Sequence, residues 1–322
     1  MEIAEQDGLV IATLDRAEAE RRAWREADVP LDIARLADSE EADDDVLAEL
    51  GFTARPHWVN WCAPVRSSEA EYTAALSGTE RRNVRLGRRV ILDESLRLVV
   101  QEGLTEELMD DFLDVYDAQI AGMPRGRNFA RARRERLLDA AAEHIGVSVY
   151  AGPTMVAGSL WRVRPEPSVL QMRFSASAPD ARSGRVLRAV YAEALEYARG
   201  RGLAHASLGN DPSLFGHVVQ PGLFNFKSRF GFTPVPSQIL DPHLGGEYAD
   251  RFLSLRSLAD PTLVVASGGY RGTSPALPEA LSARGHDLLL LSVNPAEEAA
   301  AGFLTGAFRN VSVLPVPAGA AD

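Results

Sequence analysis

The first 65 residues alternate between apolar runs of strand length and stretches rich in Ala, Glu and Arg. Alternation of this kind indicates strands and helices that follow one another along the chain. Helical composition occurs over 16–27 and 44–51. The strand-like runs lie at 9–14 (LVIATL), 31–37 (LDIARLA) and 57–65 (HWVNWCAPV). The pattern predicts a βαβαβ unit over residues 1–65.

Residues 66–256 contain more elements in a different order. In TEELMDDFLDVYDAQI the apolar side chains recur three and four positions apart, which is typical of a helix with one buried face. Helices are predicted at 68–89, 105–120, 129–144, 182–200 and 223–230. Strands are predicted at 96–103, 146–152, 154–164, 168–179, 203–209 and 237–242. This order predicts one mixed α/β domain.

The pattern changes again from residue 257. Strand-like runs at 262–267 (TLVVAS), 287–293 (DLLLLSV) and 311–316 (VSVLPV) are separated by helical stretches. They predict a second βαβαβ unit, with parallel strands expected from the usual handedness of such connections. The glycine-rich segment SGGYRGTSP after its first strand is a candidate phosphate site, although it lacks the spacing of a nucleotide-binding loop. We interpret this unit as a structural or substrate-side appendage.

The charge of the chain narrows the function classes. A net charge of −11 over 322 residues argues against a DNA-coating protein, because neutralising phosphates requires clustered cations. Arginines nevertheless cluster in TERRNVRLGRRV and in PRGRNFARARRERL, where solvated helix faces are the simplest interpretation. No apolar run approaches the length of a membrane-spanning helix, and MEIAEQDG does not resemble a secretory signal. The single Cys62 and the scattered histidines predict neither a disulfide nor a metal site, and we expect a cytoplasmic protein.

One hexapeptide pattern occurs twice, as GFTARP at 51–56 and GFTPVP at 231–236. In both places a helical stretch precedes the glycine and a strand-like stretch follows it. Glycine commonly ends helices and proline marks turns, so the recurrence has a simple local explanation. The alternative is a duplication, in which each copy ends one of two related units.

The order of elements from residue 50 to about 245 resembles the GNAT acyltransferase fold, and in particular its Fem-type branch. The resemblance depends on ERRNVRLGRR, VSVYAGPTMVAGSLWRV, ASLGND and above all GLFNFKSRFGF. It implies an α/β, GNAT-like fold in tandem arrangement. The implied parts are a reduced N-terminal GNAT-like unit (1–65), a complete catalytic domain (66–256) and a C-terminal βαβαβ appendage (257–322).

The resemblance also implies where the chemistry occurs. In this fold an amine and an acyl donor meet in a gap between two splayed strands, here LQMRFSAS and AHASLGN. Lys227, the only lysine of the chain, is expected to stabilise developing negative charge, and Asp211 to accept the proton of the amine. Substrate or donor binding is expected from Phe226, Asn210, Arg173, Ser175, Tyr191, Gly184, Arg81, Arg82, Arg85, Arg88 and Arg89. A surface lysine and an ordinary Asn-Asp-Pro turn are the structural alternatives.

The donor is the least determined part of this hypothesis. The family members that use acetyl-CoA have a glycine-rich turn that holds the pyrophosphate, and the matching segment SAPDARSGRVLRA offers only Gly184, followed by Arg185. We therefore favour aminoacyl-tRNA over acyl-CoA, with the arginine clusters as its cationic path. The expected acceptor is an amine of a small molecule or peptide precursor. We expect no permanently bound cofactor, no metal, and no binding to membrane or DNA. The alternative class is a catalytically silent GNAT-like binding module, with nucleotide bound by the C-terminal unit.

Overall fold

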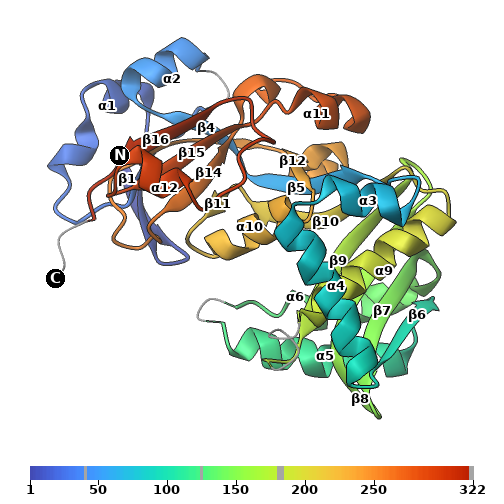
Figure 1. Ribbon diagram of the computed structural model, residues 1–322. Helices are drawn as coiled ribbons and strands as arrows, with labels where there is room; N and C mark the ends of the chain where they lie inside the picture. Colours follow the sequence, from blue (N-terminus) through green and yellow to red (C-terminus); the bar gives the residue numbers. More distant parts are fainter. Residues whose placement is uncertain (40–41, 124–125, 180–184, 319–322) are drawn as a thin grey trace. The chain divides into compact units, whose positions relative to one another are not determined.

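The computed structural model describes residues 1–39, 42–123, 126–179 and 185–318, and the chain forms two compact units (Figure 1). The first unit contains Met1–Trp61, Asn210–Ser228 and Thr233–Asp322, and the second contains Cys62–Gly209 and Arg229–Phe232. These units do not follow the predicted boundaries at 65/66 and 256/257, because the first and last parts of the chain lie in the same unit. Each unit is described by itself.

The N-terminal sheet of the first unit has the strand order β1-β2-β3-β13-β4. Its strands are β1 (Glu2–Gln6), β2 (Leu9–Leu14), β3 (Ile33–Leu36), β4 (Thr53–Pro56) and β13 (Glu247–Phe252). The helices α1 (Arg16–Glu20) and α2 (Asp44–Leu50) and the 3-10 helix Ala23–Glu26 connect them, with Trp24 and Phe52 buried edge to face. Strand β13 pairs antiparallel with both β3 and β4. A segment from near residue 250 therefore completes the sheet that the N-terminal residues begin.

A second sheet in the first unit has the order β11-β14-β15-β16. Its strands are β11 (Leu214–Phe215), β14 (Thr262–Ala266), β15 (Asp287–Ser292) and β16 (Val311–Pro315), with helices α11 (Leu277–Ala283) and α12 (Ala296–Ala300). The β15–β16 pair is parallel, as predicted, but β14 and β15 are antiparallel. Ala266 lies opposite Asp287, so the connection joins neighbouring strand ends as a long hairpin. The expectation of parallel β14 and β15 was wrong.

The remaining elements of the first unit surround the end of strand β10. They are α10 (Pro221–Arg229), β12 (Thr233–Pro236) and the 3-10 helices Ser237–Ile239 and Pro242–Leu244, with β12 next to β5 (Trp58–Pro64). The predicted strand at 237–242 is therefore wrong. The strand lies four residues earlier, and the SQILDP segment turns instead.

The second unit is built on an antiparallel meander. Within it the strand order is β5-β10-β9-β8-β7-β6, and the strands are β6 (Arg97–Glu102), β7 (His144–Ala151), β8 (Thr154–Arg164), β9 (Val169–Ser177) and β10 (His205–Pro212). Its helices are α3 (Glu69–Ala75), α4 (Gly78–Asp93), α5 (Glu106–Ala121), α6 (Phe129–Ala132), α7 (Arg134–Asp139) and α9 (Val186–Gly200). The predicted helix 129–144 is thus two short helices and the 3-10 turn Ala141–Glu143. The α/β class and the GNAT-like order of three strands, helix, strand and short helix are confirmed.

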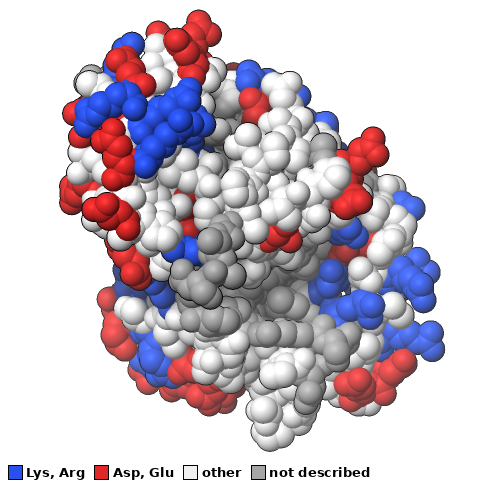
Figure 2. All heavy atoms as spheres, turned by 90° about the vertical axis from the view of Figure 1, so that its left-hand side faces the viewer, with Lys and Arg blue, Asp and Glu red and all other residues white. Residues whose placement is uncertain are grey.

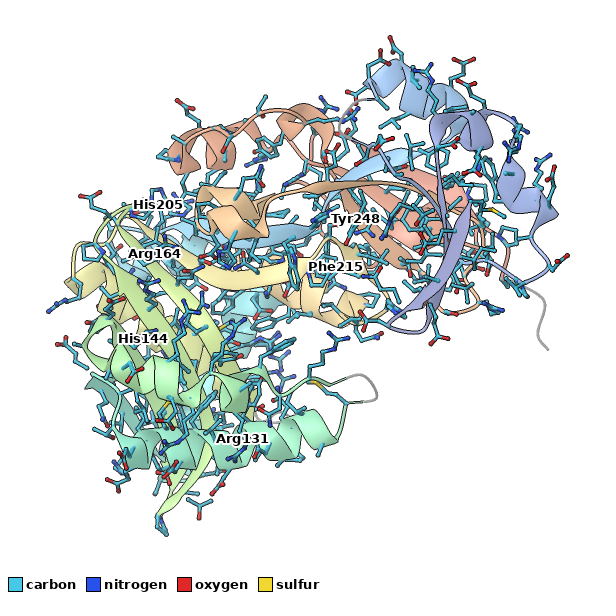
Figure 3. All side chains as sticks on the ribbon, turned by 180° about the vertical axis from the view of Figure 1, so that it is seen from behind. Arg131, His144, Arg164, His205, Phe215 and Tyr248 are labelled. Carbon is cyan, nitrogen blue, oxygen red and sulfur yellow. The ribbon has the colours of Figure 1, made fainter. Side chains whose placement is uncertain are left out.

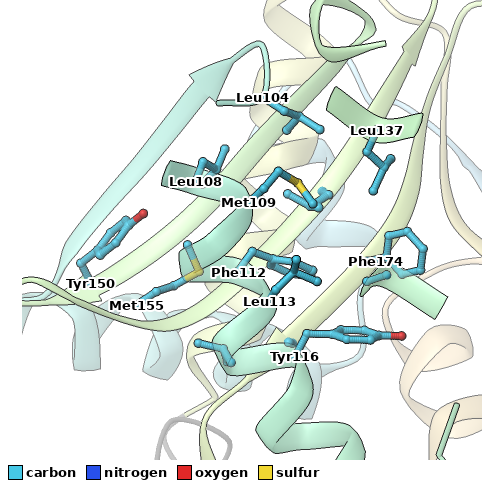
Figure 4. Packing of buried hydrophobic residues seen from close by; sticks show 14 residues of the cluster. Leu104, Leu108, Met109, Phe112, Leu113, Tyr116, Leu137, Tyr150, Met155 and Phe174 are labelled. Atoms are coloured by element: carbon cyan, nitrogen blue, oxygen red, sulfur yellow. The ribbon is translucent and has the colours of Figure 1, made fainter. Parts of the chain in front are cut away.

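Helices cover both faces of this meander (Figure 1). Phe112 of α5 packs with Leu160 of β8 and Phe174 of β9 in one buried cluster (Figure 4). The next residue of β8, Trp161, faces the other way and contacts Tyr191 of α9 edge to face. Because neighbouring strand residues point to opposite faces, α5 and α9 lie on opposite sides of the sheet.

The two copies of Gly-Phe-Thr adopt the same local structure. Gly51 and Gly231 have left-handed backbones, with φ of +73° and +89°. Each glycine follows a helix and precedes a four-residue strand, and Phe52 and Phe232 are buried. Left-handed glycine is a common helix ending, so the shared conformation has a local cause and the duplication stays a prediction.

Candidate functional site

Strands β9 and β10 form a parallel pair with a short ladder. Three residue pairs join them, from His205 opposite Val169 to Ser207 opposite Gln171. Both strands continue, β9 to Ser177 and β10 to Pro212, and no further pair between them occurs in the described parts of the chain. Beyond Gln171, β9 keeps its partner β8 on one edge only. The two predicted strands are neighbours with a short ladder, and they stay close at Gly209, where an added Cβ would lie 3.0 Å from the Met172 carbonyl oxygen, so the gap between them stays a prediction.

A bulge interrupts β9 where the ladder with β10 ends. The register between β8 and β9 shifts, so that Leu160 lies opposite Phe174 and Trp161 opposite Met172. Arg173 is the extra residue, and its side chain is partly exposed. A bulge redirects a side chain away from strict alternation, so simple alternation does not determine where Arg173 points. Its expected role in binding stays a prediction.

Ser175 and Tyr191, both predicted binding residues, are in contact. The Tyr191 hydroxyl donates to Ser175 Oγ over 2.7 Å, which joins α9 to the part of β9 beyond the ladder. Trp161 stands edge-on to the Tyr191 ring at 5.9 Å, and its own indole N–H donates to Ser159. The two hydroxyls are thus held in a fixed geometry on the second unit.

Lys227 and Asp211, the predicted catalytic residues, form a buried ion pair. Lys227 Nζ lies 2.7 Å from Asp211 Oδ2, and the two side chains are 4% and 8% exposed. Burial raises the pKa of the Asp211 carboxyl, while Lys227 opposes that rise. The lysine of α10 is therefore paired with the carboxylate at the end of β10 and is not a surface residue, while the catalytic roles of both groups stay predictions.

Asn210 lies beside this pair in a network that the sequence did not reveal. Its carbonyl oxygen accepts from Asn60 Nδ2 over 2.7 Å and from Ser237 Oγ over 2.9 Å. Its amide donates to Asp241 Oδ2 over 2.7 Å. A buried asparagine within the apolar run HWVNWCAPV was the available signal for Asn60, whereas Ser237 and Asp241 carried none. Phe226, next to Lys227 on α10, is partly buried.

The first arginine cluster lies along α4 and is only partly neutralised. Arg81 donates to the Ala74 carbonyl, and Arg88 and Arg89 pair with Glu69 and Asp93. Arg82 and Arg85 are exposed and have no hydrogen-bond or ion-pair partner among the described residues.

The second arginine cluster is also partly paired, and its exposed Arg133 and Arg136 have no ion-pair partner among the described residues. Arg131 binds Asp117 of α5, and Arg134 binds Asp110 of α5 and its neighbour Glu135 (Arg131 is labelled in Figure 3). Arg125 lies outside the described residues. On the face that Figure 2 shows, basic side chains lie in small groups beside acidic ones. Ion pairs therefore offset the charge of Arg131 and Arg134 in the folded chain.

The start of α9 is where an acyl-CoA pyrophosphate would be expected. Gly184 lies outside the described residues. Arg185 has a left-handed backbone, with φ of 63°, and its side chain donates to Asn83 of α4 over 2.8 Å. A Cβ added at Gly87 of α4 would lie 2.5 Å from the Arg185 carbonyl oxygen and 3.5 Å from the Ala189 nitrogen. Helix α4 therefore packs directly against the first turn of α9.

Within the described residues, no group of three or more His, Cys, Asp and Glu side chains is arranged to hold a metal ion. In the same parts of the chain no helix is long and apolar enough to cross a membrane.

Comparison with known proteins gives matches among solved structures alone. No protein-family model and no curated protein sequence matches the chain. FemX matches over 76% of this chain and 81% of its own, at 14% identity and a TM-score of 0.44. The C-terminal domain of a protein assigned as a lysylphosphatidylglycerol synthetase from Agrobacterium fabrum matches over 77% and 78%, at 13% identity and a TM-score of 0.42. A glucosamine N-acetyltransferase region of a fungal beta-N-acetylglucosaminidase matches over 77% of this chain and 30% of its own, at 12% identity and a TM-score of 0.37. The GNAT-like fold rests on the order of strands and helices, not on these scores.

Proposed function

We propose that this protein is a GNAT-type N-acyltransferase that forms an amide bond on an amine acceptor. The observation that carries the proposal is the parallel β9–β10 pair, whose ladder ends after three residue pairs while both strands continue. Backbone N–H and C=O groups on the open edge of a strand can bind an extended ligand as another strand would. An acyl donor held along β9 in this way presents its carbonyl carbon in a fixed orientation, and orientation supplies much of the rate in such reactions.

The reaction forms one bond and breaks one bond. The neutral amine attacks the carbonyl carbon of the donor ester or thioester, the C–N bond forms, and the C–O or C–S bond breaks. The tRNA oxygen or the CoA sulfur leaves and takes up one proton, and the amine nitrogen loses one, so the proton removed from the amine is passed on to the leaving group. Asp211 is proposed to accept that proton and Lys227 to offset the charge that develops, as a coupled pair joined over 2.7 Å.

We favour aminoacyl-tRNA as the donor, with acyl-CoA as the alternative. A pyrophosphate at the start of α9 would compete with α4, which packs there through Gly87. The exposed Arg82 and Arg85 on α4 offer charge to the phosphates of an RNA instead. The acceptor is proposed to be a small molecule or a peptide precursor, and a cytoplasmic location belongs to the same proposal.

The donor is tested by binding. Purified protein is titrated with charged tRNA and, separately, with acetyl-CoA at several salt concentrations. We expect tRNA binding whose logarithmic salt slope falls by about 1 to 2 in the double variant Arg82→Glu/Arg85→Glu, because each phosphate contact contributes roughly 0.7 to 0.9. The matched charge reversal Arg16→Glu/Arg21→Glu, at the first residue and the C-cap of α1, should leave the slope unchanged. Saturable acetyl-CoA binding without tRNA affinity would refute the tRNA donor and leave the acyl-CoA alternative.

A turnover assay distinguishes an acyltransferase from a catalytically silent binding module. The protein is incubated with each donor and a mixture of amino acids and glucosamine, and release of uncharged tRNA or free CoA is measured. We expect release that depends on the amine and that Lys227→Met abolishes. Donor binding without release under any of these conditions would favour the binding module.

A further inference from the structure

The four-stranded sheet of the first unit ends at strand β16. The strand order is β11-β14-β15-β16, and among the described strands β16 pairs with β15 alone, in parallel. A strand at the edge of a sheet presents a row of N–H and C=O groups to which another strand can add. This edge belongs to the first unit, and the proposed acyl transfer does not use it. The inference therefore stands independently of the proposed function.

Two hydrogen bonds show which backbone groups of this segment are directed at β15. The Asn310 carbonyl accepts from the Leu288 N–H over 2.9 Å, and the Val316 N–H donates to the Ser292 carbonyl over 3.1 Å. Leu288 and Ser292 both belong to β15. Successive residues of a strand direct their N–H and C=O groups to alternate sides. Even-numbered residues of the segment therefore face β15, and odd-numbered residues face away from it.

The backbone groups that face away come from Val311, Val313 and Pro315. The N–H groups of Val311 and Val313 have no hydrogen-bond partner in the described parts of the chain. Proline has no N–H, so Pro315 offers its carbonyl alone. Beyond it the edge is closed, because the Pro317 carbonyl accepts from the Leu255 N–H over 2.9 Å. The open edge is thus as long as β16 itself.

The side chains of β16 do little to protect this edge. Edge strands usually carry charges or prolines, or are very short, which keeps other strands from adding to them. Strand β1 contains two glutamates, β6 begins with Arg97 and ends with Glu102, and β12 has two prolines in four residues. The five residues of β16 include no charge, and its Val311 and Leu314 are 42% and 38% exposed. Pro315, at one end, is its single protective residue.

We propose that β16 pairs antiparallel with β16 of a second copy of this chain, which makes the protein a two-fold symmetric dimer. Each copy has a net charge of −11, so contact between copies is favoured where the surface is uncharged. A basic partner would instead be attracted to acidic surface, and β16 has no acidic residue. Antiparallel pairing of identical strands is isologous and closes with two copies, so it gives a dimer rather than a fibre.

The strand is self-complementary when the two-fold axis passes beside Val313. Val313 then lies opposite Val313 of the partner subunit, and each donates its N–H to the carbonyl of the other. Val311 lies opposite Pro315 of the partner subunit and donates to its carbonyl, so the missing N–H of proline leaves only the Val311 carbonyl to water. Side-chain contacts across the strands are Val with Val and Val with Pro on one face, and Ser312 with Leu314 on the other. None of these contacts involves a charge.

Sedimentation equilibrium on the full chain tests for the dimer, with about 1 to 100 µM protein in about 150 mM salt, which screens the net repulsion. One pair of short strands buries less than the roughly 1,000 Å² of a stable interface, so the dimer should be weak. We expect a reversible equilibrium between 34.9 kDa and twice that mass, with a Kd of about 1–100 µM. A monomer throughout this range would overturn the proposal.

A matched pair of substitutions locates the interface. Val311→Glu and Ile3→Glu each add one negative charge at an apolar residue of an edge strand, 42% and 39% exposed. We expect Val311→Glu to raise the Kd at least about tenfold, because its carboxylate would lie against Pro315 of the partner subunit. Ile3→Glu, on β1, should change the Kd less than about twofold. Equal weakening by both would indicate general repulsion between acidic proteins and would refute the site.

Variants of Val313 test the pairing itself. Val313→Pro removes an N–H that faces away from β15, so the fold should be retained, as circular dichroism checks, while the Kd rises at least about tenfold. Val313→Cys should form a disulfide-linked dimer on mild oxidation, because Cα atoms about 5.5 Å apart suit a disulfide, and the native Cys62 is buried. Ile3→Cys is its control. An unchanged Kd for Val313→Pro, or equal cross-linking of the two cysteine variants, would overturn the pairing; if Val313→Pro does not fold, the cysteine variants decide.

Discussion

The buried pair of Lys227 and Asp211 allows a stability prediction of defined size. Lys227→Met keeps a long, unbranched side chain of similar shape and removes the ammonium group that lies 2.7 Å from Asp211 Oδ2. The carboxylate would then stand alone in surroundings where it is 8% exposed. Loss of one partner of a buried pair costs about 3–5 kcal/mol, because the other charge stays buried without compensation. We expect a decrease of that size in the free energy of unfolding at pH 7.

The stability loss of Lys227→Met should change with pH in a direction that follows from the pKa of Asp211. Burial already raises the pKa of Asp211 above its ordinary value of 3.8, and Lys227 is the main group that opposes the rise. Without Lys227 the folded-state pKa rises further, so the folded protein holds a proton that the unfolded chain has released. A raised carboxyl pKa contributes stability below the unfolded pKa and loses it as pH rises through the folded value. The deficit of Lys227→Met should therefore be largest at pH 7 and shrink as pH falls toward 4.

The assay is urea unfolding of four proteins: wild type, Lys227→Met, Asp211→Asn and the double variant. Because the chain has two compact units, circular dichroism and tryptophan fluorescence must give coincident transitions before a free energy is assigned. We expect the double variant to regain most of the loss, since no buried charge remains in it. A cost below about 1 kcal/mol for Lys227→Met at pH 7, or a double variant no more stable than the single ones, would refute this reasoning.

Three further predictions concern single contacts. Burial lowers the pKa of His286 from 6.5 to about 4, so between these pH values only the unfolded chain binds a proton at this residue. The free energy of unfolding should therefore fall by about 1.4 kcal/mol per pH unit from pH 6.5 to 4, about 3 kcal/mol in all. This pH dependence should be absent from urea titrations of His286→Phe. Gly87→Val places a Cβ 2.5 Å from the Arg185 carbonyl oxygen and should destabilise the protein by roughly 1–3 kcal/mol in urea unfolding, whereas Gly78→Ala, whose nearest neighbour is 3.9 Å away, should not. Tyr191→Phe removes the hydrogen bond to Ser175 and should cost about 1 kcal/mol, measured in the same way; no loss would show that water replaces the hydroxyl fully.

The elements that could be predicted from the sequence are those with local contacts. The predicted strand 154–164 matches β8 (Thr154–Arg164), and the predicted helix 105–120 matches α5 (Glu106–Ala121) within one residue at each end. Both belong to an antiparallel meander and its covering helix, where neighbouring elements in sequence are neighbours in space. The periodicity of apolar residues is sufficient there, because each element's buried face is set by the next.

Long-range pairing could not be read from the pattern. Strand β13 pairs with Ala34 and Ala54 from its own position near residue 250, and nothing in EYADRF marks it as a partner of the N-terminal strands. The prediction that β14 and β15 are parallel was wrong for a related reason. The long connection between them permits either direction, so the connection alone does not determine how the strands pair. Where compact units are assembled from distant segments, their boundaries are set by strand pairing, which composition does not reveal.

At the candidate site, too, the sequence indicated which residues matter but not which residues they contact. A single lysine in a chain with 34 basic residues, placed by the Phe-Lys resemblance, singled out Lys227, and the end of a strand singled out Asp211. The sequence predicted a role for each but not their contact. Asn210 forms hydrogen bonds with Asn60 and Asp241, which are 150 and 31 residues away in the sequence. No local sequence signal links them to Asn210.

The folded chain also changes what the arginine clusters can support. In the sequence both clusters are equal candidates for a cationic path to tRNA. In the structure Asp110 and Asp117 of α5 bind Arg134 and Arg131, and this pairing cancels much of the field that an RNA phosphate would meet. Helix α4 keeps exposed arginines at 82 and 85 without described partners. The second cluster keeps exposed Arg133 and Arg136 without described ion pairs, so a test of the tRNA proposal at Arg82 and Arg85 addresses the α4 cluster.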